Sequence, residues 1–498
     1  MNLYRPCNKY SIICLISFLL IFLGIFLISS WSFLYDQITR SSMTLTPTSM
    51  AFDIWKKNPV PMKIDFYFYN WTNPQDIHNV TVKPKFVELG PYRFIETKEK
   101  SNITWNANNN TVTFNHVKKW YFDPENSPRS LFDEITTLNP TTVSASYAAR
   151  DWSYFVKKGL SVALKSMASK IHITKTVGEL LFEGYEDPLL NMARNMPFLA
   201  GSSMPPMDKF GWFYGRNGSE TYEGTFNMDT GVDGSLGRLY RWKGMNHTDF
   251  YKDECSDVGG SAGEFFPPNM NKETIIKFFS ADLCRTMELE FQKEMELHNM
   301  AAYKFSAGDR FLDNGTKFAA NKCYCMGDCM PSGAVNVSAC RYGSPAFVSL
   351  PHFHKADSYY QDCIEGVTSE DSKHDFYMVF EPTTGIPLEV AARLQLNLLI
   401  HPINSIEMFE TVPKVYFPVM WFEQVVKMPD SMALQIRLLL NFQVICCSAG
   451  ITLIFAGLLV QFCFCYKLCS AKFCKKKCKN EDIVIKERVP LTDGNYRL

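Results

Sequence analysis

Residues that could bind a metal or cross-link the chain are concentrated between positions 321 and 354. The segment NKCYCMGDCMPSGAVNVSAC is followed closely by SLPHFHK, and together they contain Cys323, Cys325, Cys329, Cys340, His352 and His354. Thiolates and imidazoles bind zinc, whereas thiols in an oxidising compartment form disulfides. Two histidines alone are a weak metal signal. Because the spacing fits both readings, the compartment must decide between a metal site and a cross-linked domain.

Two long apolar segments near the ends of the chain indicate a membrane protein. Residues 11–35 and 438–466 contain 25 and 29 residues, respectively, without a charged side chain. About 20 apolar residues suffice for a helix to cross the hydrocarbon core of a bilayer. The first segment is longer than the apolar region of a cleaved signal peptide, and no obvious small-residue cleavage site follows it. We therefore predict two retained transmembrane helices, over 11–35 and 438–466.

Basic residues beside these segments predict their orientation. Arg5 and Lys9 precede the first segment without an acidic residue, and six lysines follow the second before any acidic residue. Lys and Arg accumulate on the cytoplasmic side of transmembrane helices. We therefore expect residues 1–10 and 467–498 to be cytosolic tails and residues 36–437 to form one extracellular or luminal domain.

N-glycosylation sequons agree with this topology. All eight lie between the apolar segments, at Asn70, Asn79, Asn102, Asn109, Asn217, Asn246, Asn314 and Asn336. A single tripeptide arises by chance, but confinement of all eight to one region supports a secretory-side domain. Such a compartment favours disulfides over zinc for the cysteines of this domain. The domain has seven cysteines, so one stays unpaired, and counting alone leaves the pairing open.

The pattern of side chains in this domain predicts an α+β fold. MKIDFYFYNWT (62–72) alternates like a half-buried strand, and ITWNANNNTVTF (103–114) reads as a hairpin. FYMVFEP and LQLNLLI indicate later strands. Residues 152–175 and 274–297 contain good helix formers and predict two helices. Strands at both ends with a helical insert between them are typical of an α+β domain.

The first predicted helix is strongly basic. Residues 152–178 contain no acid, but they contain His172 and the lysines Lys157, Lys158, Lys165, Lys170 and Lys175. The tails carry +2 and +5 in a neutral chain, so the remainder sums to −7 and these lysines make a local positive field. On a helical wheel, Lys158, Lys165 and His172 share one side. They form either an ordinary solvated face or a docking patch for oxidised lipids, fatty-acid carboxylates or acidic proteins.

No motif argues persuasively for an enzyme or a cofactor. GGSAG (259–263) fits G-x-S-x-G around Ser261, but DECSDV before it and EFFPP after it do not resemble the strand and helix of a nucleophile elbow. The chain has no HExxH, Walker loop or GxGxxG. We expect no catalytic residue, no cofactor, no metal and no nucleic-acid partner.

Cysteines also lie beside the membrane on the cytosolic side. Cys7 precedes the first apolar segment, and the second leads into Cys463, Cys465, Cys469, Cys474 and Cys478 among lysines. Juxtamembrane cysteines are candidates for palmitoylation, and the lysines would attract anionic lipids. Unmodified thiols are the alternative.

Several long motifs in order resemble the class B scavenger receptor family. They are NPVPMKIDFYFYNWTNPQDI, VELGPYRF, ELLFEGYEDPLL, FFPPNMNKETIIKFFSADLCR, SLPHF and EPTTGIPLEVAARLQLNLLIHP. The family includes the platelet glycoprotein IV fatty-acid translocase, the lysosomal integral membrane protein and the insect sensory-neuron membrane proteins. The resemblance covers nearly the whole chain, and the NWTNPQDI block is most similar to an invertebrate phagocytic and lipid-uptake branch.

The resemblance implies an antiparallel β-rich core, an apical helical bundle over about residues 150–200, and an apolar tunnel through the core. It also implies the disulfides Cys255–Cys323, Cys284–Cys340 and Cys325–Cys329, with Cys363 free. The family's ligand-contacting lysines align near Ser166 and Ala168, with Lys165 and Lys170 beside them. The basic patch is therefore similar in character but not residue by residue.

The function implied is that of a cell-surface scavenger receptor. It would bind modified lipoproteins, fatty acids, apoptotic cells or microbes at the apical lysines and pass hydrophobic molecules towards the membrane. An adhesion, phagocytic or lysosomal cargo receptor without lipid passage is the alternative, and a two-helix ligand-gated channel is a remote one. Glu487 and Leu491 resemble a lysosomal sorting signal, but Thr492 replaces its second aliphatic residue, which favours the plasma membrane. A homo-oligomer is compatible with the sequence.

Overall fold

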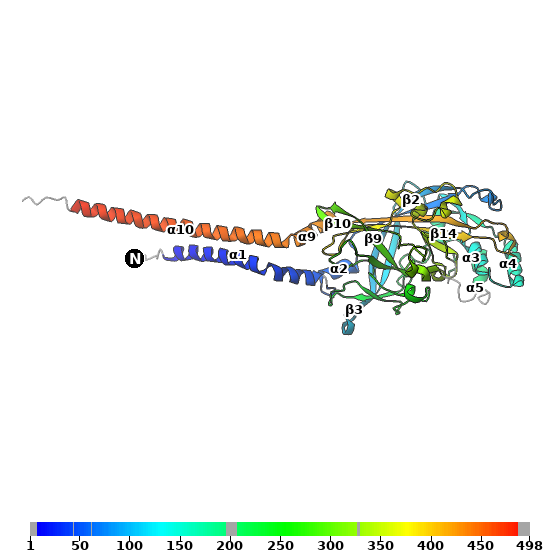
Figure 1. The fold of residues 1–498 in the computed structure, drawn as a ribbon, viewed down its shortest axis with the longest axis horizontal. Helices are drawn as coiled ribbons and strands as arrows, with labels where there is room; N and C mark the ends of the chain where they lie inside the picture. The colour runs from blue at the N-terminus through cyan, green and yellow to red at the C-terminus, as the bar shows by residue number, and fades with distance from the viewer. Residues whose placement is uncertain (1–6, 43, 61, 196–206, 326–328, 487–498) are drawn as a thin grey trace, which may run out of the picture. The chain divides into compact units, whose positions relative to one another are not determined.

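The computed structural model describes residues 7–42, 44–60, 62–195, 207–325 and 329–486 (Figure 1). It contains two compact units. The first comprises Met1–Ser41 with Leu434–Leu498, and the second comprises Ser42–Ala433.

The first unit is built from the two terminal helices. These are α1 (Cys7–Ser42) and α10 (Phe442–Lys486), and α9 (Asp430–Leu440) leads into α10. The stretches Ser11–Ser41 and Phe442–Lys472 are long and apolar enough to cross a membrane. The predicted apolar helices are therefore present, and the second apolar span begins at Phe442 rather than at 438.

Small residues allow α1 and α10 to pack closely. A Cβ atom on Gly24 would lie 2.6 Å from the carbonyl oxygen of Gly450. Ser17 Oγ donates a hydrogen bond to the carbonyl oxygen of Gly457 over 2.9 Å. Close backbone approach at small residues is typical of helix pairs in membranes. Gly450 and Gly457 of α10 therefore face α1.

The second unit is dominated by antiparallel strands. They are β1 (Met62–Trp71), β2 (Phe86–Asn106), β3 (Thr111–Phe122), β4 (Glu134–Leu138), β5 (His172–Thr176), β6 (Thr225–Asp229), β7 (Leu239–Trp242), β8 (Ile276–Ser280), β9 (Arg285–Leu297), β10 (Met300–Ser306), β11 (Ala334–Asn336), β12 (Ala346–Ser349), β13 (Tyr377–Phe380), β14 (Pro387–Ile400) and β15 (Val415–Lys427). Thirteen form one sheet, whose main order is β7-β6-β3-β2-β1-β15-β14-β13-β10-β9-β8, and β12 joins β11 to β14. Strands β4 and β5 pair separately. The predicted α+β fold with a β-rich core is confirmed.

Residues 260–262 connect the two edges of the large sheet. The backbone N–H of Leu239 in β7 donates to the carbonyl oxygen of Gly260 over 2.9 Å. The N–H of Ser261 donates to Lys277 of β8 over 2.8 Å, and Phe279 of β8 donates back to Ser261 over 2.9 Å. The sheet therefore closes into a near-barrel, which removes the exposed edges that invite aggregation.

Cross-strand register identifies the face that lines this barrel. One row of partners runs across β14, β15, β1, β2 and β3 through Ala392, Gln424, Ile64, Phe94 and Phe122. Directly paired residues lie on the same face of a sheet. Glu264, beside the closing segment, reaches Lys98 and Lys100, which share a face of β2 with Phe94. Because β2 lies three positions from β7, Glu264 must cross the interior to reach it.

The remaining α-helices among the described residues are short. They are α2 (Met50–Lys56), α3 (Pro140–Ala148), α4 (Tyr154–Ser166), α5 (Pro188–Asn195), α7 (Tyr359–Asp362) and α8 (Asp371–His374). Figure 1 shows α3, α4 and α5 gathered at one end of the second unit, while α2 lies at the other.

Both sequence-predicted helices require correction. The first ends at Ser166, and residues 172–176 form β5 instead. The second, residues 274–297, is not helical but forms β8, a turn and β9. Its Arg285, Met287 and Leu289 are buried with the period of two that a strand requires. Pairing with β8 and β10 therefore outweighs the helix propensity of its Glu, Lys, Met and Leu residues.

Candidate functional site

The five lysines predicted to bind ligands lie in or after α4. Lys157, Lys158 and Lys165 are on α4, Lys170 follows it, and Lys175 is on β5. His172 begins β5 and does not share a helical face with Lys158 and Lys165, so that part of the helical-wheel prediction is wrong.

Acidic residues accompany several of these lysines. Lys158 Nζ lies 3.4 Å from Glu410 Oε1, and Lys165 Nζ lies 3.4 Å from Glu407 Oε1. Lys175 is 3.4 Å from Glu179. The side chains of Lys165 and Glu407 are 75% and 69% exposed. Exposed pairs of this kind contribute about 0–1 kcal/mol, so an arriving anion could replace the glutamates at small cost.

The outer face of α4 is apolar. The side chains of Phe155 and Val162 are 83% and 69% exposed, and their seven-residue spacing places them on the same side of the helix. Trp152, Tyr154 and Val156 are also exposed, whereas Leu164 on the opposite side is buried. The helix therefore presents aromatic and aliphatic groups flanked by lysines, a combination typical of surfaces that contact lipid interfaces.

The interior face of β14 is unusual for a packed barrel. Its inward side chains remain partly accessible and are Val390, Ala392, Leu394 and Leu396. Ala391, Arg393 and Gln395 point the other way and are buried. In a barrel filled by side chains, the inward apolar residues would be the most buried. The apolar side chains on this face of β14 pack against the hydrophobic core but are less completely buried than Ala391, Arg393 and Gln395 on the opposite face.

A group of charged residues lies inside the barrel. We call it the interior charge cluster, and its members are Lys98, Lys100, His116, Lys118, Glu223 and Glu264. Glu264 Oε1 lies 2.8 Å from Lys98 Nζ and 2.5 Å from Lys100 Nζ. Glu223 lies 3.0 Å from His116 Nδ1 and 2.5 Å from Lys118 Nζ. Burial lowers the pKa of His116 to about 4, while the neighbouring lysines keep the pKa of Glu264 well below its usual value despite burial.

The interior charge cluster has only a weak signal in the sequence. The sequence pattern that marks the cluster is a charged residue at every second position of β2, at Glu96, Lys98 and Lys100. Their cross-strand partners on β3 are Trp120, Lys118 and His116, respectively. Alternating charges usually indicate a solvated face, so the closed barrel is needed to show that they point inward.

Three disulfides use six of the seven cysteines in the second unit. They are Cys255–Cys323, Cys284–Cys340 and Cys325–Cys329, the pairs that the family resemblance implies. Cys363 has a free thiol whose pKa is raised by burial. No cysteine of NKCYCMGDC is therefore left to bind zinc as a thiolate.

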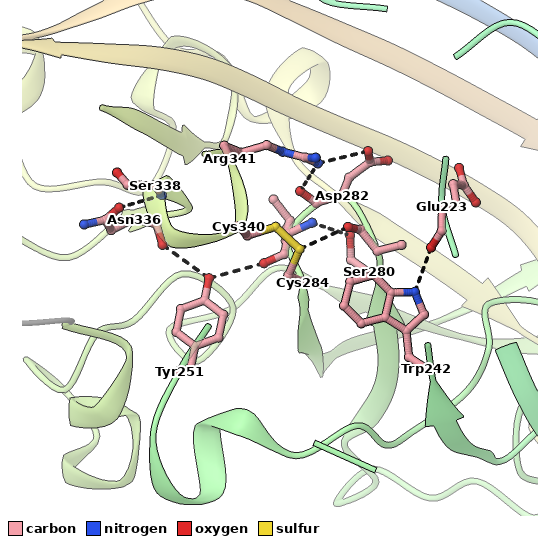
Figure 2. Close-up of a disulfide and its surroundings, with 12 residues drawn as sticks. Glu223, Trp242, Tyr251, Ser280, Asp282, Cys284, Asn336, Ser338, Cys340 and Arg341 are labelled. Carbon is pink, nitrogen blue, oxygen red and sulfur yellow. Dashed lines mark hydrogen bonds and ion pairs between the residues drawn. A yellow bond between two sulfur atoms is a disulfide. The ribbon is translucent and has the colours of Figure 1, made fainter. Parts of the chain in front are cut away.

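Polar contacts surround the Cys284–Cys340 bond (Figure 2). Tyr251 Oη donates to the carbonyl oxygens of Leu283 and Asn336, each over 3.2 Å. Arg341 donates to the backbone carbonyl and the side chain of Asp282. The bond thus joins the β8–β9 turn to the segment after β11.

His352, His354 and Ser261 have structural surroundings. His352 Nε2 lies 2.6 Å from Glu88 Oε2, and its ring stacks on His374 with centroids 4.1 Å apart. His354 is buried, with Nε2 3.6 Å from Asp371. Ser261 Oγ donates to the carbonyl oxygen of Phe265 over 2.5 Å. Among the described residues, no group of three or more His, Cys, Asp or Glu side chains is arranged to hold a metal.

The eight sequons differ in accessibility. The exposed asparagines are Asn79, Asn102, Asn109, Asn217 and Asn246. Asn70 and Asn336 are partly buried, and Asn314 is only 3% exposed. Glycosylation of the exposed asparagines remains a prediction.

The palmitoylation candidates lie along or beside the terminal helices. Cys463, Cys465 and Cys469 are exposed on α10. Cys7 is in α1, and Cys474 and Cys478 are in α10, where the structure describes only the backbone. The sorting residues Glu487 and Leu491 lie outside the described residues.

Comparison with known proteins connects these features to one family. Residues 14–468 match the CD36 family profile. The chain belongs to the CD36 family. It is 38% identical to protein peste of Drosophila melanogaster over 440 residues, which are 87% of this chain and 78% of peste. It is 32% identical to scavenger receptor class B member 1 of Rattus norvegicus over 81% of this chain and 78% of that protein. Identity to human lysosome membrane protein 2 is 29% over 88% of this chain and 90% of that protein.

Family membership indicates the general class of the protein and its membrane location. CD36 family members are receptors rather than enzymes, and the relatives support a lipid-handling membrane receptor. The two terminal apolar helices fit a protein of the plasma or lysosomal membrane.

Proposed function

We propose that the protein is a cell-surface scavenger receptor that docks anionic lipid ligands at α4 and passes hydrophobic molecules through its barrel. Modified lipoproteins and fatty acids are the principal ligands, and the exposed lipids of apoptotic cells or microbes have the same chemistry. Both termini are cytosolic in this proposal, and the second unit is extracellular.

The partly accessible apolar face of β14 is the observation that carries the proposal. Leu394 and its neighbours on that face provide hydrocarbon-like contacts within a closed sheet. Each CH₂ transferred from water to such a surface contributes roughly 0.8 kcal/mol. A long acyl chain would therefore favour the barrel interior over water, and a concentration gradient would drive it onward.

Docking is supported by the charge arrangement at α4. Lys165 is mostly exposed, and its ion pair with Glu407 is long and solvated. Lys170 is exposed. These ammonium groups can therefore meet phosphate or carboxylate groups of a lipid particle while Phe155 and Val162 contact its apolar part.

Charge reversal tests the docking step. Replacing Lys158, Lys165 and Lys170 with Glu should reduce binding of oxidised lipoprotein at least tenfold in cells with normal surface expression. Glu407→Lys should raise binding. Lys272→Glu is the matched control, because Lys272 is an exposed lysine (59%) that also forms an ion pair, with Glu294 on β9 over 3.0 Å. Unchanged binding by the triple variant would exclude this docking surface.

Filling the barrel tests passage. Ala392→Trp places a large side chain on the inner face of β14 and should slow fatty-acid uptake while leaving lipoprotein docking intact. Ala301→Trp is the control, because Ala301 is an exposed alanine on β10. Equal uptake by Ala392→Trp and wild type would leave a receptor without lipid passage.

Localisation distinguishes the surface receptor from a lysosomal cargo receptor. Staining of intact and permeabilised cells should place most of the wild-type protein at the surface, with or without Leu491→Ala. A shift from lysosomes to the surface on replacing Leu491 would instead favour the lysosomal alternative.

A further inference from the structure

The path through the barrel is not apolar throughout. Phe94 lies at one end of the inward row of β2, and Lys98 and Lys100 follow on the same face. On β3, the inward row passes from Trp120 through Lys118 and His116 to Phe114. A hydrophobic molecule moving along these strands would therefore meet the interior charge cluster.

Apolar contacts lie on both sides of the cluster. Phe94 packs with Phe122 and Phe182, with ring centroids 5.3 and 5.0 Å apart. On the other side, Phe114 packs against Trp55 with centroids 4.9 Å apart. The cluster is therefore a polar layer between two apolar regions of the interior.

Positive charge exceeds negative charge in this layer. Three lysines face two glutamates, while burial keeps His116 largely neutral near pH 7. The surrounding ionisable groups Arg216, Arg341, Glu96 and Asp282 add two charges of each sign and leave the excess unchanged. Burial lowers the pKa of Lys100 to about 8, and repulsion from Lys98 and Lys118 acts in the same direction although Glu264 opposes it.

Lys100 also has unused hydrogen-bonding capacity. Its ammonium group has three N–H donors, and within the described residues it donates only to Glu264 Oε1. Its other near neighbours are the faces of Trp55 and Phe114, 5.4 and 6.0 Å from Nζ. The second oxygen of Glu264 and Nε2 of the buried His116 have no hydrogen-bond partner. Buried polar groups normally have hydrogen-bond partners. The unpaired donors and acceptors of this layer could therefore bind one more polar group.

Part of the layer remains accessible. The side chains of Lys98, Lys118 and Glu264 are 18%, 21% and 23% exposed, although all three face inward. The side chain of Lys100 is only 3% exposed. An oxyanion would therefore meet Lys98 first, and it would reach Lys100 by taking the place of Glu264 Oε1 as hydrogen-bond acceptor.

We propose that Lys98 and Lys100 form an internal binding site for the anionic head group of a single-chain amphiphile, with a carboxylate as the principal ligand. The hydrocarbon chain lies along the inner apolar face beside Phe94 and Leu394. This inference rests on the proposed passage of lipids through the barrel and adds a point at which the head group is held. It also predicts that the barrel distinguishes a charged amphiphile from a neutral one of equal length.

Paired ligands and variants test the site. Purified full-length protein in nanodiscs is titrated with oleate and with oleyl alcohol, which has the same chain without the charge. Lys98→Met should weaken oleate binding about tenfold and change oleyl alcohol binding less than twofold. Glu264 keeps Lys100 as a partner in this variant, so no buried carboxylate is left unpaired. Glu264→Gln should strengthen oleate binding because it increases the positive excess.

Lys119→Met is the matched control, because Lys119 lies on β3 but is exposed on the opposite face. It should leave binding of both ligands unchanged. Acetate at millimolar concentration should compete only weakly with oleate, because it lacks the chain that occupies the apolar face.

The outcomes separate this site from the proposed function. If Lys98→Met weakens both ligands equally, or neither, the head-group site is wrong while lipid passage stands. If wild-type protein binds neither ligand, passage through the barrel fails, and the site fails with it. Strong acetate competition would show a general anion site rather than an amphiphile site and would also overturn the inference.

Discussion

The imidazole rings of His352 and His374 stack with their centroids 4.1 Å apart and their planes 12° from parallel. Glu88 holds His352 through its Oε2, 2.6 Å from Nε2, and also accepts a hydrogen bond from Trp421 Nε1 over 2.7 Å. His374 Nδ1 accepts the backbone N–H of Glu370 over 2.8 Å. That hydrogen bond requires an unprotonated Nδ1. Protonation of His374 at low pH therefore converts Nδ1 from an acceptor into a donor, and the hydrogen bond from the backbone N–H of Glu370 is lost.

Stability should consequently fall on acidification. Burial, and then repulsion from His352, lowers the pKa of His374 to about 4, whereas an ordinary imidazole titrates near pH 6.5. The folded protein binds this proton more weakly than the unfolded chain. The contribution of His374 to stability is thus complete above about pH 6.5 and decreases as the pH falls towards 4. His374→Asn, whose Oδ1 can accept the same N–H, should reduce the decrease in Tm between pH 7 and 5.

An exposed histidine provides the control for this measurement. His247→Asn should leave the pH dependence of Tm unchanged, because His247 lies on the surface. Carboxylates also titrate in this range, so the difference between each variant and wild type is the informative quantity. Parallel Tm curves for His374→Asn and wild type would contradict the prediction.

Barrel closure should depend on Gly260. Its φ is +76°, and a Cβ there would lie 2.6 Å from the backbone of Lys277. Gly260→Ala should lower stability by about 1–3 kcal/mol because it combines a disfavoured conformation with a backbone clash. Gly259→Ala is the adjacent control, since a Cβ at Gly259 meets no atom within 4 Å. Equal Tm values for both variants would show that residues 260–262 do not restrain the sheet.

The sequons should not all be used. Asn314 Nδ2, the atom to which a glycan would attach, donates to the carbonyl oxygen of Met330 over 2.6 Å. Asn246, in contrast, is exposed. Mass spectrometry after enzymatic deglycosylation in ¹⁸O water should find Asn246 labelled and Asn314 unlabelled. Asn314→Gln should destabilise the protein by about 1–3 kcal/mol through a lost buried hydrogen bond, and Asn246→Gln should not. A glycan at Asn314 would show that this loop folds differently.

The residues themselves show how far prediction from sequence could reach. The terminal helices and β1 follow from local patterns, since charge-free length and strict alternation need no distant partner. The Glu, Lys and Met residues of β9 favour helices in isolation and therefore predict the wrong element. Alternation of Met287 and Leu289 was the better signal, but only pairing with β8 and β10 makes it decisive.

Features that depend on contacts between distant parts of the chain could not be predicted from local sequence patterns. Lys98 and Lys100 look like solvated residues of an alternating strand until residues 260–262 join β7 to β8 and place them inside. Likewise, the acid-free segment 152–178 identifies a run of lysines in the sequence. It could not show that Glu407 and Glu410, about 250 positions later in the sequence, would lie beside them.

The Cys284–Cys340 disulfide should be the most informative cross-link to remove. It spans 56 positions, and closing a loop of that length in the unfolded chain stabilises the folded state by about 4 kcal/mol. Cys284→Ala with Cys340→Ala should therefore lower Tm by several degrees, even though Tyr251 still joins Leu283 to Asn336. Cys363→Ser is the control, because Cys363 is outside the three disulfides and its loss should have little effect. Peptide mapping under non-reducing conditions should find Cys363 as a free thiol. A bridged Cys363, or a Tm unaffected by loss of Cys284 and Cys340, would contradict the pairing on which this prediction depends.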